Sequence, residues 1–215
     1  MRMAGVHPTG EGIPTFGKRF AILNLDLMAI MFDSIKDTDE GKLFVSNCIR
    51  WNEAVHQHHP RPLTIFTTLC FSNSSQPELA RPSPFANLID ELGDFVKGSP
   101  EVQIDKSLKL DEKDIVLHKT RWYAGAGNAL EQILKAQGIN TIVISGITLS
   151  GVVMSTVYRL FDLDYNIYVV SDNVMEFPGE GSAELRECLL TTQLKNMNVG
   201  IITLDEALKM LELAG

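Results

Sequence analysis

Short apolar runs of strand length alternate along the chain with segments of helical periodicity. Most of these runs are apolar on both faces, which is typical of parallel strands buried beneath helices on both sides of a sheet. Six strands are predicted, at residues 20–25, 63–68, 114–118, 141–145, 166–170 and 200–203.

Between the predicted strands, apolar residues recur every three or four positions. In the stretch 40–57 such a stripe is formed by Phe44, Cys48, Trp51 and Val55, as expected of a helix that packs on a sheet. Further helices are predicted at 127–137, 153–161, 183–194 and 204–213. The alternation predicts an α/β fold, a doubly wound three-layer α/β/α sandwich with a mainly parallel six-stranded sheet.

The composition changes this picture little. With 45% hydrophobic and 21% charged residues, the 215-residue chain is typical of one globular domain. Residues 1–17 contain four glycines and two prolines, so we expect a flexible arm at 1–17 and a single domain at 18–215. No stretch approaches the roughly 18 apolar residues of a membrane span, and we expect a cytoplasmic protein with no membrane contact.

Charge and cysteine usage narrow the expected partners. The net charge is −8 and the basic residues are scattered, which argues against nucleic acid as a partner. Cys48, Cys70 and Cys188 are far apart and show no CxxC spacing. We therefore expect reduced thiols and neither a disulfide framework nor a zinc site.

Polar residues stand where three of the predicted strands end. Asp26 ends the first strand, Lys119 ends the third, and the stretch 146–152 follows the fourth and opens a helix. In doubly wound folds, ligands bind beyond the carboxyl ends of the strands. The sequence thus predicts a pocket where a carboxylate, an ammonium group and a helix N-terminus converge.

The residues around these positions resemble the isochorismatase-like (cysteine hydrolase) family from about Phe20 onward. The sequence N-L-D-L-M at 24–28 resembles the family's first-strand motif, apolar-apolar-Asp-Met-Gln, and K-T-R-W-Y-A-G at 119–125 resembles its Lys-x-Arg-x-Ser-Ala-Phe. Two later runs are also similar to the family, G-I-N-T-I-V-I-S-G at 138–146 and Y-N-I-Y-V-V-S-D at 165–172. The resemblance implies the same fold.

The family's nucleophile motif has a glycine, a threonine three residues later, and a cysteine three residues after that. Alignment on Gly146, and independently on Ser155-Thr156, places Leu149 at the threonine and Val152 at the cysteine. Because a valine side chain has no lone pair, thioester chemistry at this position is excluded. The chain thus resembles a family member that lacks the nucleophilic cysteine.

The resemblance has three further implications. The metal motif of the nicotinamidase branch, Asp-x-His, would fall on Leu69-Cys70-Phe71, so we expect a metal-independent protein without a cofactor. The family tends to carry a cis peptide at the position of Ile147–Thr148. It also implies a homo-oligomer, a dimer or tetramer, for which the apolar helices after Val152 and near Leu189 are candidate contact faces.

Isochorismatases proper also lack the cysteine, and their vinyl-ether cleavage needs an acid and water in place of a covalent intermediate. By that analogy, Asp26 is the expected general acid, and Lys119 is expected to hold an anionic substrate or to stabilise developing negative charge. Backbone N–H groups of Gly151 and Val152 are expected to form an anion site. The remaining expected substrate-binding residues are Thr148, Trp122, Tyr123, Cys70 and Phe71.

The leading hypothesis is a small-molecule enzyme that uses Asp26 and Lys119 for non-covalent hydrolysis, elimination or rearrangement of an unsaturated or carbonyl substrate. The alternative is a catalytically inactive homologue that binds a ligand or a protein. A relocated nucleophile at Cys70 is a third hypothesis, whereas Ser150 is expected to point elsewhere. Arg121 is expected to anchor its loop.

One histidine-rich tract, H-Q-H-H-P at 56–60, looks superficially like a metal site. It ends a predicted helix and has no carboxylate or cysteine at an obvious ligand spacing. We therefore interpret it as a solvated helix end.

Overall fold

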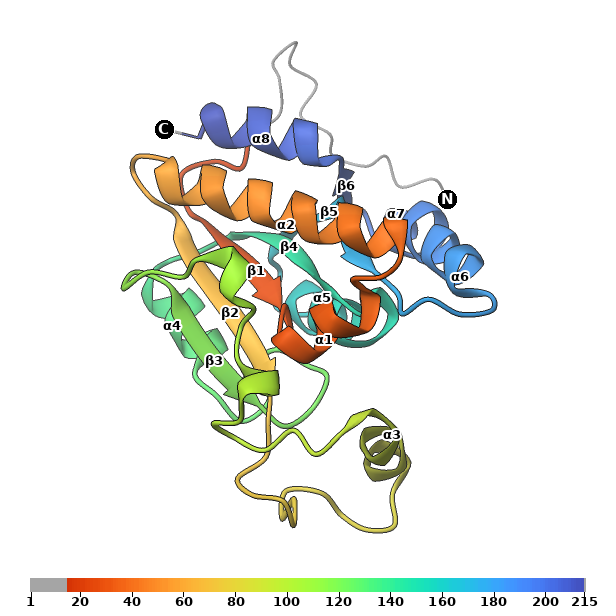
Figure 1. Cartoon of the computed structure of the whole chain (residues 1–215). Helices are drawn as coiled ribbons and strands as arrows, with labels where there is room; N and C mark the ends of the chain where they lie inside the picture. The colour runs from red at the N-terminus through yellow and green to blue at the C-terminus, as the bar shows by residue number, and fades with distance from the viewer. Residues whose placement is uncertain (1–14, 215) are drawn as a thin grey trace, which may run out of the picture.

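One six-stranded sheet runs through the structure, a computed structural model that describes residues 15–214 (Figure 1). Its strand order is β3-β2-β1-β4-β5-β6, and every neighbouring pair is parallel. This confirms the predicted parallel sheet. The strands are β1 (Phe20–Leu25), β2 (Leu63–Leu69), β3 (Ile115–Lys119), β4 (Thr141–Ile147), β5 (Asn166–Met175) and β6 (Gly200–Ile202).

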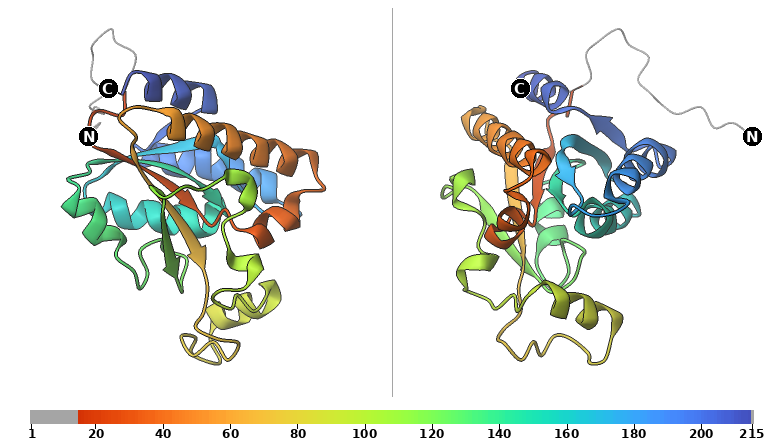
Figure 2. Two further views of the ribbon diagram at one scale, coloured as in Figure 1. Left: turned by 60° about the vertical axis from the view of Figure 1, so that its left-hand side comes forward. Right: turned by 45° about the vertical axis from the view of Figure 1, so that its right-hand side comes forward.

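Helices cover both faces of the sheet, as two turned views show (Figure 2). The helices are α1 (Ala29–Ile35), α2 (Asp39–Gln57), α3 (Pro84–Leu92), α4 (Leu130–Ala136), α5 (Met154–Phe161), α6 (Ser182–Cys188), α7 (Leu194–Asn196) and α8 (Leu204–Glu212). Short helical turns are η1 (Pro100–Val102), η2 (Lys106–Leu108), η3 (Leu149–Val153) and η4 (Leu189–Gln193). The three-layer α/β/α sandwich is thus present as predicted.

The alternation of side chains along β1 explains the two apolar layers. Leu23 and Leu25 point into a core shared with α4 and α5, whereas Ile22 points into a core shared with α2 and α8. Because every residue of β1 is buried, the strand has no solvent-exposed face. This is why its sequence is apolar at every position except Asn24.

Two helices were not predicted from the sequence. The apolar helix α1 follows directly after Asp26 and has no side-chain cap at its N-terminus. Helix α3 begins with Pro84, and the Ser83 side chain accepts a hydrogen bond from the Ala86 N–H. Serine followed by proline is a helix-start signal, so α3 could have been found. Strand β5 also extends five residues beyond its predicted end at 170.

The beginning of the described chain is packed. Phe16 is 1% exposed and contacts the rings of Phe20, Trp51 and Tyr168. The packed part of the chain thus includes Phe16, which the sequence analysis placed in the arm; residues 1–14 of that arm lie outside the described residues. Between residues 15 and 214, no helix has the length and apolarity to cross a membrane.

Candidate functional site

Asp26 is the first residue after β1, and its backbone turns out of the strand with a positive φ of 56°. Aspartate adopts this left-handed conformation more readily than most residues with a side chain. Its N–H donates to Thr67 on β2, to the carbonyl oxygen at 3.1 Å and to the hydroxyl oxygen at 3.2 Å. These bonds fix the turn at the carboxyl edge of the sheet.

Both carboxylate oxygens of Asp26 have partners. The Thr67 hydroxyl donates to Oδ1 at 2.9 Å, and the Lys119 Nζ lies 2.7 Å from Oδ2. Lys119 also donates from Nζ to the Arg121 carbonyl oxygen at 3.0 Å. With 4% of Asp26 and 1% of Lys119 exposed, the structure brings the two charged residues together in a buried ion pair.

The sheet register explains why a lysine can reach Asp26. Lys119 ends β3 and lies opposite Leu69 on β2, while β1 is one strand further. Two strand spacings amount to about 9.6 Å, a gap that the long lysine side chain and the turned carboxylate close together. A shorter basic side chain at this position would not make the pair.

The surroundings of Asp26 act on its pKa in opposite directions. Burial raises the pKa of the Asp26 carboxyl group, while the Lys119 ammonium and the Thr67 hydroxyl oppose the rise. The net direction is upward. A carboxyl group with a raised pKa can hold and donate a proton nearer to neutral pH than an ordinary aspartate.

The segment after β4 lies beside the end of β1. Gly146 is paired with Leu25, and a Cβ atom at Gly146 would be only 2.7 Å from the Leu25 carbonyl oxygen. A glycine is therefore required for this close approach. The next peptide bond, Ile147–Thr148, is cis, as the family resemblance implies.

A helical turn, η3, begins immediately afterwards and continues into α5. The Thr148 hydroxyl accepts a hydrogen bond from the Gly151 N–H at 3.2 Å, so this N–H is engaged inside the turn. Val152 is 2% exposed and packs in the core shared with α4 and α5. The position expected for a nucleophile therefore holds a buried apolar side chain.

Sequence reasoning missed Glu176 at this edge of the sheet. Glu176, the first residue after β5, accepts hydrogen bonds from both the N–H and the hydroxyl of Ser150, the latter at 2.9 Å. Burial raises the pKa of Glu176. The criterion that selected Asp26 and Lys119, a charged residue at a strand end, would have found Glu176 had β5 been predicted at its full length.

The loop after Lys119 contacts the same turn through Trp122. A Cβ atom at Gly151 would lie 3.3 Å from the Trp122 ring, which also meets the Phe85 ring edge-on at 6.2 Å. Arg121 donates to the Glu78 carbonyl oxygen at 2.8 Å and stacks over Phe85. Its contacts are those of a residue that anchors the loop.

Tyr123 is held differently. Its hydroxyl donates to the Glu131 carboxylate on α4 at 2.7 Å, and Arg159 from α5 binds the same carboxylate. Burial and Glu131 raise the pKa of Tyr123. The structure thus ties the Tyr123 hydroxyl to α4, while Trp122 contacts the turn at Gly151.

Cys70 and Phe71 follow β2. The Cys70 N–H donates to the Lys119 carbonyl oxygen at 3.0 Å, and burial raises the pKa of its thiol, which lowers its thiolate fraction. Phe71 is fully buried and its N–H donates to the Phe95 carbonyl oxygen at 2.8 Å. A metal does not fit here in the manner of nicotinamidases, because the side chains of Leu69 and Phe71 have no ligand atoms.

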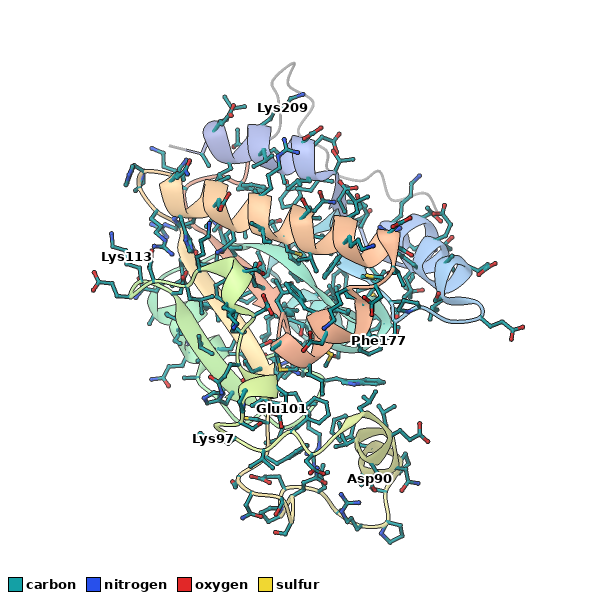
Figure 3. The ribbon with its side chains drawn as sticks, in the orientation of Figure 1. Asp90, Lys97, Glu101, Lys113, Phe177 and Lys209 are labelled. Atoms are coloured by element: carbon teal, nitrogen blue, oxygen red, sulfur yellow. The ribbon has the colours of Figure 1, made fainter. Side chains whose placement is uncertain are left out.

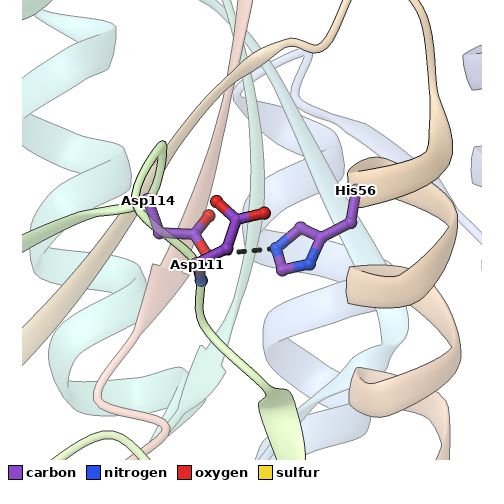
Figure 4. A group of neighbouring side chains, drawn as sticks. All are labelled: His56, Asp111 and Asp114. Carbon is purple, nitrogen blue, oxygen red and sulfur yellow. Dashed lines mark hydrogen bonds and ion pairs between the residues drawn. The ribbon is translucent and has the colours of Figure 1, made fainter.

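The interpretation of the histidine-rich tract as a solvated helix end is wrong for His56. Its Nε2 lies 3.1 Å from the Asp114 carboxylate, and Asp111 is adjacent (Figure 4). The fold supplies these carboxylates from more than 50 residues away, so no local spacing reveals them. The geometry suits a metal, but Arg61 already pairs with both aspartates, which makes the cluster an ion-pair network.

Comparison with solved structures identifies the fold. An isochorismatase family protein from Burkholderia thailandensis superposes with a TM-score of 0.73 at 22% identity, covering 94% of this chain and 100% of that one. A cysteine hydrolase from Pseudomonas syringae pv. phaseolicola 1448A gives 0.77 at 15% identity, with 98% and 100% covered. The N-carbamoylsarcosine amidase from Thermoplasma acidophilum gives 0.68 at 17%, with 87% and 97% covered.

Sequence comparison matches this chain to one relative over a short segment and to one protein family over most of its length. The ureidoacrylate amidohydrolase RutB of Variovorax paradoxus (strain S110) is 31% identical over 85 residues, which span 40% of this chain and only 34% of that protein. The isochorismatase domain, in contrast, matches residues 20–203, from the start of β1 to one residue past the end of β6. Since this match spans the whole sheet, the chain belongs to the isochorismatase family.

Proposed function

We propose that this chain is a small-molecule enzyme in which Asp26 and Lys119 perform acid–base chemistry without a covalent cysteine intermediate. The observation that supports this most is their buried ion pair, with 2.7 Å between Nζ and Oδ2. The proposed reaction is hydrolysis, elimination or rearrangement of an unsaturated or carbonyl substrate.

In this mechanism, Asp26 reacts in its protonated form, in which Lys119 donates a hydrogen bond to the carboxyl group, and it gives its proton to an electron-rich carbon or oxygen of the substrate. The carboxylate that remains is stabilised by the Lys119 ammonium and the Thr67 hydroxyl, which already contact its two oxygens. Attack of water on the cation, or loss of a proton from it, completes the reaction and returns a proton to Asp26. The same two contacts hold the carboxyl group in one orientation throughout.

The thiols of this chain support a non-covalent reaction. The position that aligns with the family cysteine is Val152, and the nearest alternative, Cys70, has a thiol whose pKa is raised by burial. Although two relatives are named as an amidohydrolase and an amidase, we do not extend thioester-forming amide hydrolysis to this chain.

A second candidate function is ligand binding without turnover. The observation that favours it is the low exposure of the pair, 4% for Asp26 and 1% for Lys119, because a buried carboxyl group transfers no proton to a molecule that binds beside it without reaching it. An enzyme with this site must open before its substrate reaches the carboxyl group.

The test is a screen of amides, vinyl ethers, enols and small aromatic acids by thermal shift, followed by product analysis. We expect wild type to consume at least one compound and Asp26→Asn to bind it without turnover. Asp33→Asn is the matched control, because Asp33 is an exposed carboxylate on α1. Binding without turnover by wild type, or equal turnover by Asp26→Asn, contradicts the proposal.

A further inference from the structure

A cavity of about 410 Å³ lies between α1, α3 and the segment after β5. Six of its eight lining residues are apolar, and the lining contains no charged residue. The apolar residues are Ile30, Met31, Leu92, Phe95, Phe177 and Pro178. The volume lies in the range of small-molecule pockets, about 300–1,000 Å³.

The two polar lining residues offer little to a charged ligand. The Ser34 hydroxyl donates to the Met31 carbonyl oxygen at 2.7 Å. The Thr38 hydroxyl donates to the Ile35 carbonyl oxygen and accepts from the Gly41 N–H, both at 2.9 Å. Because both hydroxyl protons are used within their own segment, the cavity suits an uncharged, apolar group.

The walls of the cavity extend from the strand ends that carry the Asp26 site. Ile30 and Met31 lie four and five residues after Asp26 on α1. Phe95 is joined to the end of β2 by the hydrogen bond from the Phe71 N–H at 2.8 Å. The cavity therefore lies at the carboxyl edge of the sheet, where ligands of this fold class bind.

The third wall is held by Glu176. Phe177 and Pro178 directly follow Glu176, whose carboxylate binds Ser150. Figure 3 labels Phe177, which lies beside α1. The tether between β5 and the turn after β4 thus links this apolar wall to the segment that contains Gly151 and Val152.

We infer that this cavity binds the uncharged apolar portion of the substrate, while the reactive polar end of the substrate reaches Asp26 once that site has opened. Binding of an apolar group in the cavity is independent of the proposed function; only the placement of the reactive end at Asp26 rests on it. A small molecule is the expected occupant, since eight lining residues fall well short of the 20–30 residues that a stable protein interface buries on each side.

The experiment uses the full chain labelled with ¹³C at the methionine methyl groups, with Met31 as the reporter, assigned through Met31→Leu. Indole is the neutral apolar probe, and acetate is a charged probe without an apolar ring. We expect indole to shift the Met31 signal saturably, and acetate to leave it unchanged at the same concentrations. Leu92→Trp, which fills the cavity, should weaken indole binding at least tenfold, whereas Leu213→Trp, at an exposed leucine outside the cavity, should not.

An absent or non-saturable shift overturns the inference, as does unchanged affinity in Leu92→Trp. A Met31 shift that follows protein concentration instead of indole also overturns it, because a second copy then occupies the cavity. Asp26→Asn separates the two proposals. If Asp26→Asn keeps full turnover while indole still binds at Met31, the proposed function fails alone; if no probe enters while Asp26→Asn abolishes turnover, the cavity inference fails alone.

Discussion

Asp26 combines a left-handed backbone with a carboxylate that is bound on both oxygens. A non-glycine residue in this conformation costs of the order of 1 kcal/mol, and the bonds to Thr67 and Lys119 offset that cost. The arrangement orients the side chain before any substrate binds. At the scale of the residue, this preorganisation is the main argument for a catalytic role.

The raised pKa of Asp26 predicts a pH dependence of stability. The folded protein binds this proton more tightly than the unfolded chain, so the stability contributed by Asp26 is greatest below about pH 4, its unfolded pKa. This contribution to stability is lost as pH rises through the folded pKa of Asp26. The total loss is about 1.4 kcal/mol for each pKa unit between the unfolded and the folded value. Urea unfolding of wild type and Asp26→Asn from pH 4 to 8 measures the difference.

We expect the stability of wild type relative to Asp26→Asn to decrease as pH rises across this range. Lys119→Met should move the decrease to higher pH, because it removes the ammonium group that opposes the rise in pKa. A relative stability that increases with pH would show that the folded pKa is lowered instead, and would contradict the acid role.

Sequence reasoning found Asp26 and Lys119 because both stand at the ends of apolar runs. It did not find Thr67, because a threonine inside a predicted strand gives no signal until the register places it beside Asp26. The direction of the Asp26 pKa shift could not be predicted from the sequence either, since it depends on whether the effect of burial or that of the nearby ammonium group is larger.

At the scale of elements, the site depends on how the segments after β4 and β5 are held together. Glu176→Ala removes both bonds to Ser150. We expect faster hydrogen exchange in residues 147–153. We also expect a loss of about 1 kcal/mol of stability, which is less than for a fully buried hydrogen bond because Glu176 is half-buried. Glu180→Ala, an exposed glutamate in the same loop, is the control. Equal hydrogen exchange in Glu176→Ala and Glu180→Ala would show that the bonds from Glu176 to Ser150 do not hold residues 147–153.

A second link between elements is the ion-pair network at the start of β3. The Asp114 side chain is fully buried and bound by Arg61 at 2.7 Å and by His56. Because Asp114→Asn removes the buried carboxylate and leaves Arg61 paired only with the half-exposed Asp111, it should cost about 2 kcal/mol. Chemical unfolding should show a far smaller change for Asp90→Asn, whose pair with Arg81 is exposed. Similar losses would contradict this account.

The strands were predictable because burial on both faces leaves continuous apolar runs. Residues 171–175 of β5 were not, because Ser171, Asp172 and Asn173 interrupt the apolar pattern. Helix α1 was missed because its seven residues are too few for a clear period. The position of α3 at the rim of the apolar cavity depends on tertiary contacts that the sequence pattern does not contain.

At the scale of the whole molecule, large apolar side chains are exposed on α5 and α6, among them Tyr158, Phe161 and Leu185. We predict that this face forms the homo-oligomer contact. Wild type should sediment as a dimer or tetramer, and Phe161→Glu should dissociate it, whereas Leu213→Glu, at an exposed leucine after α8, should not. A monomeric wild type would refute the prediction.

The most direct test of the central claim is the pH dependence of turnover for a compound found in the screen. Acid catalysis by Asp26 predicts a kcat/KM that falls as pH rises through the raised pKa of Asp26, insensitivity to iodoacetamide, and no turnover by Asp26→Asn. A kcat/KM that rises with pH, and is abolished by iodoacetamide or by Cys70→Ala, would assign the reaction to a thiolate and contradict the account.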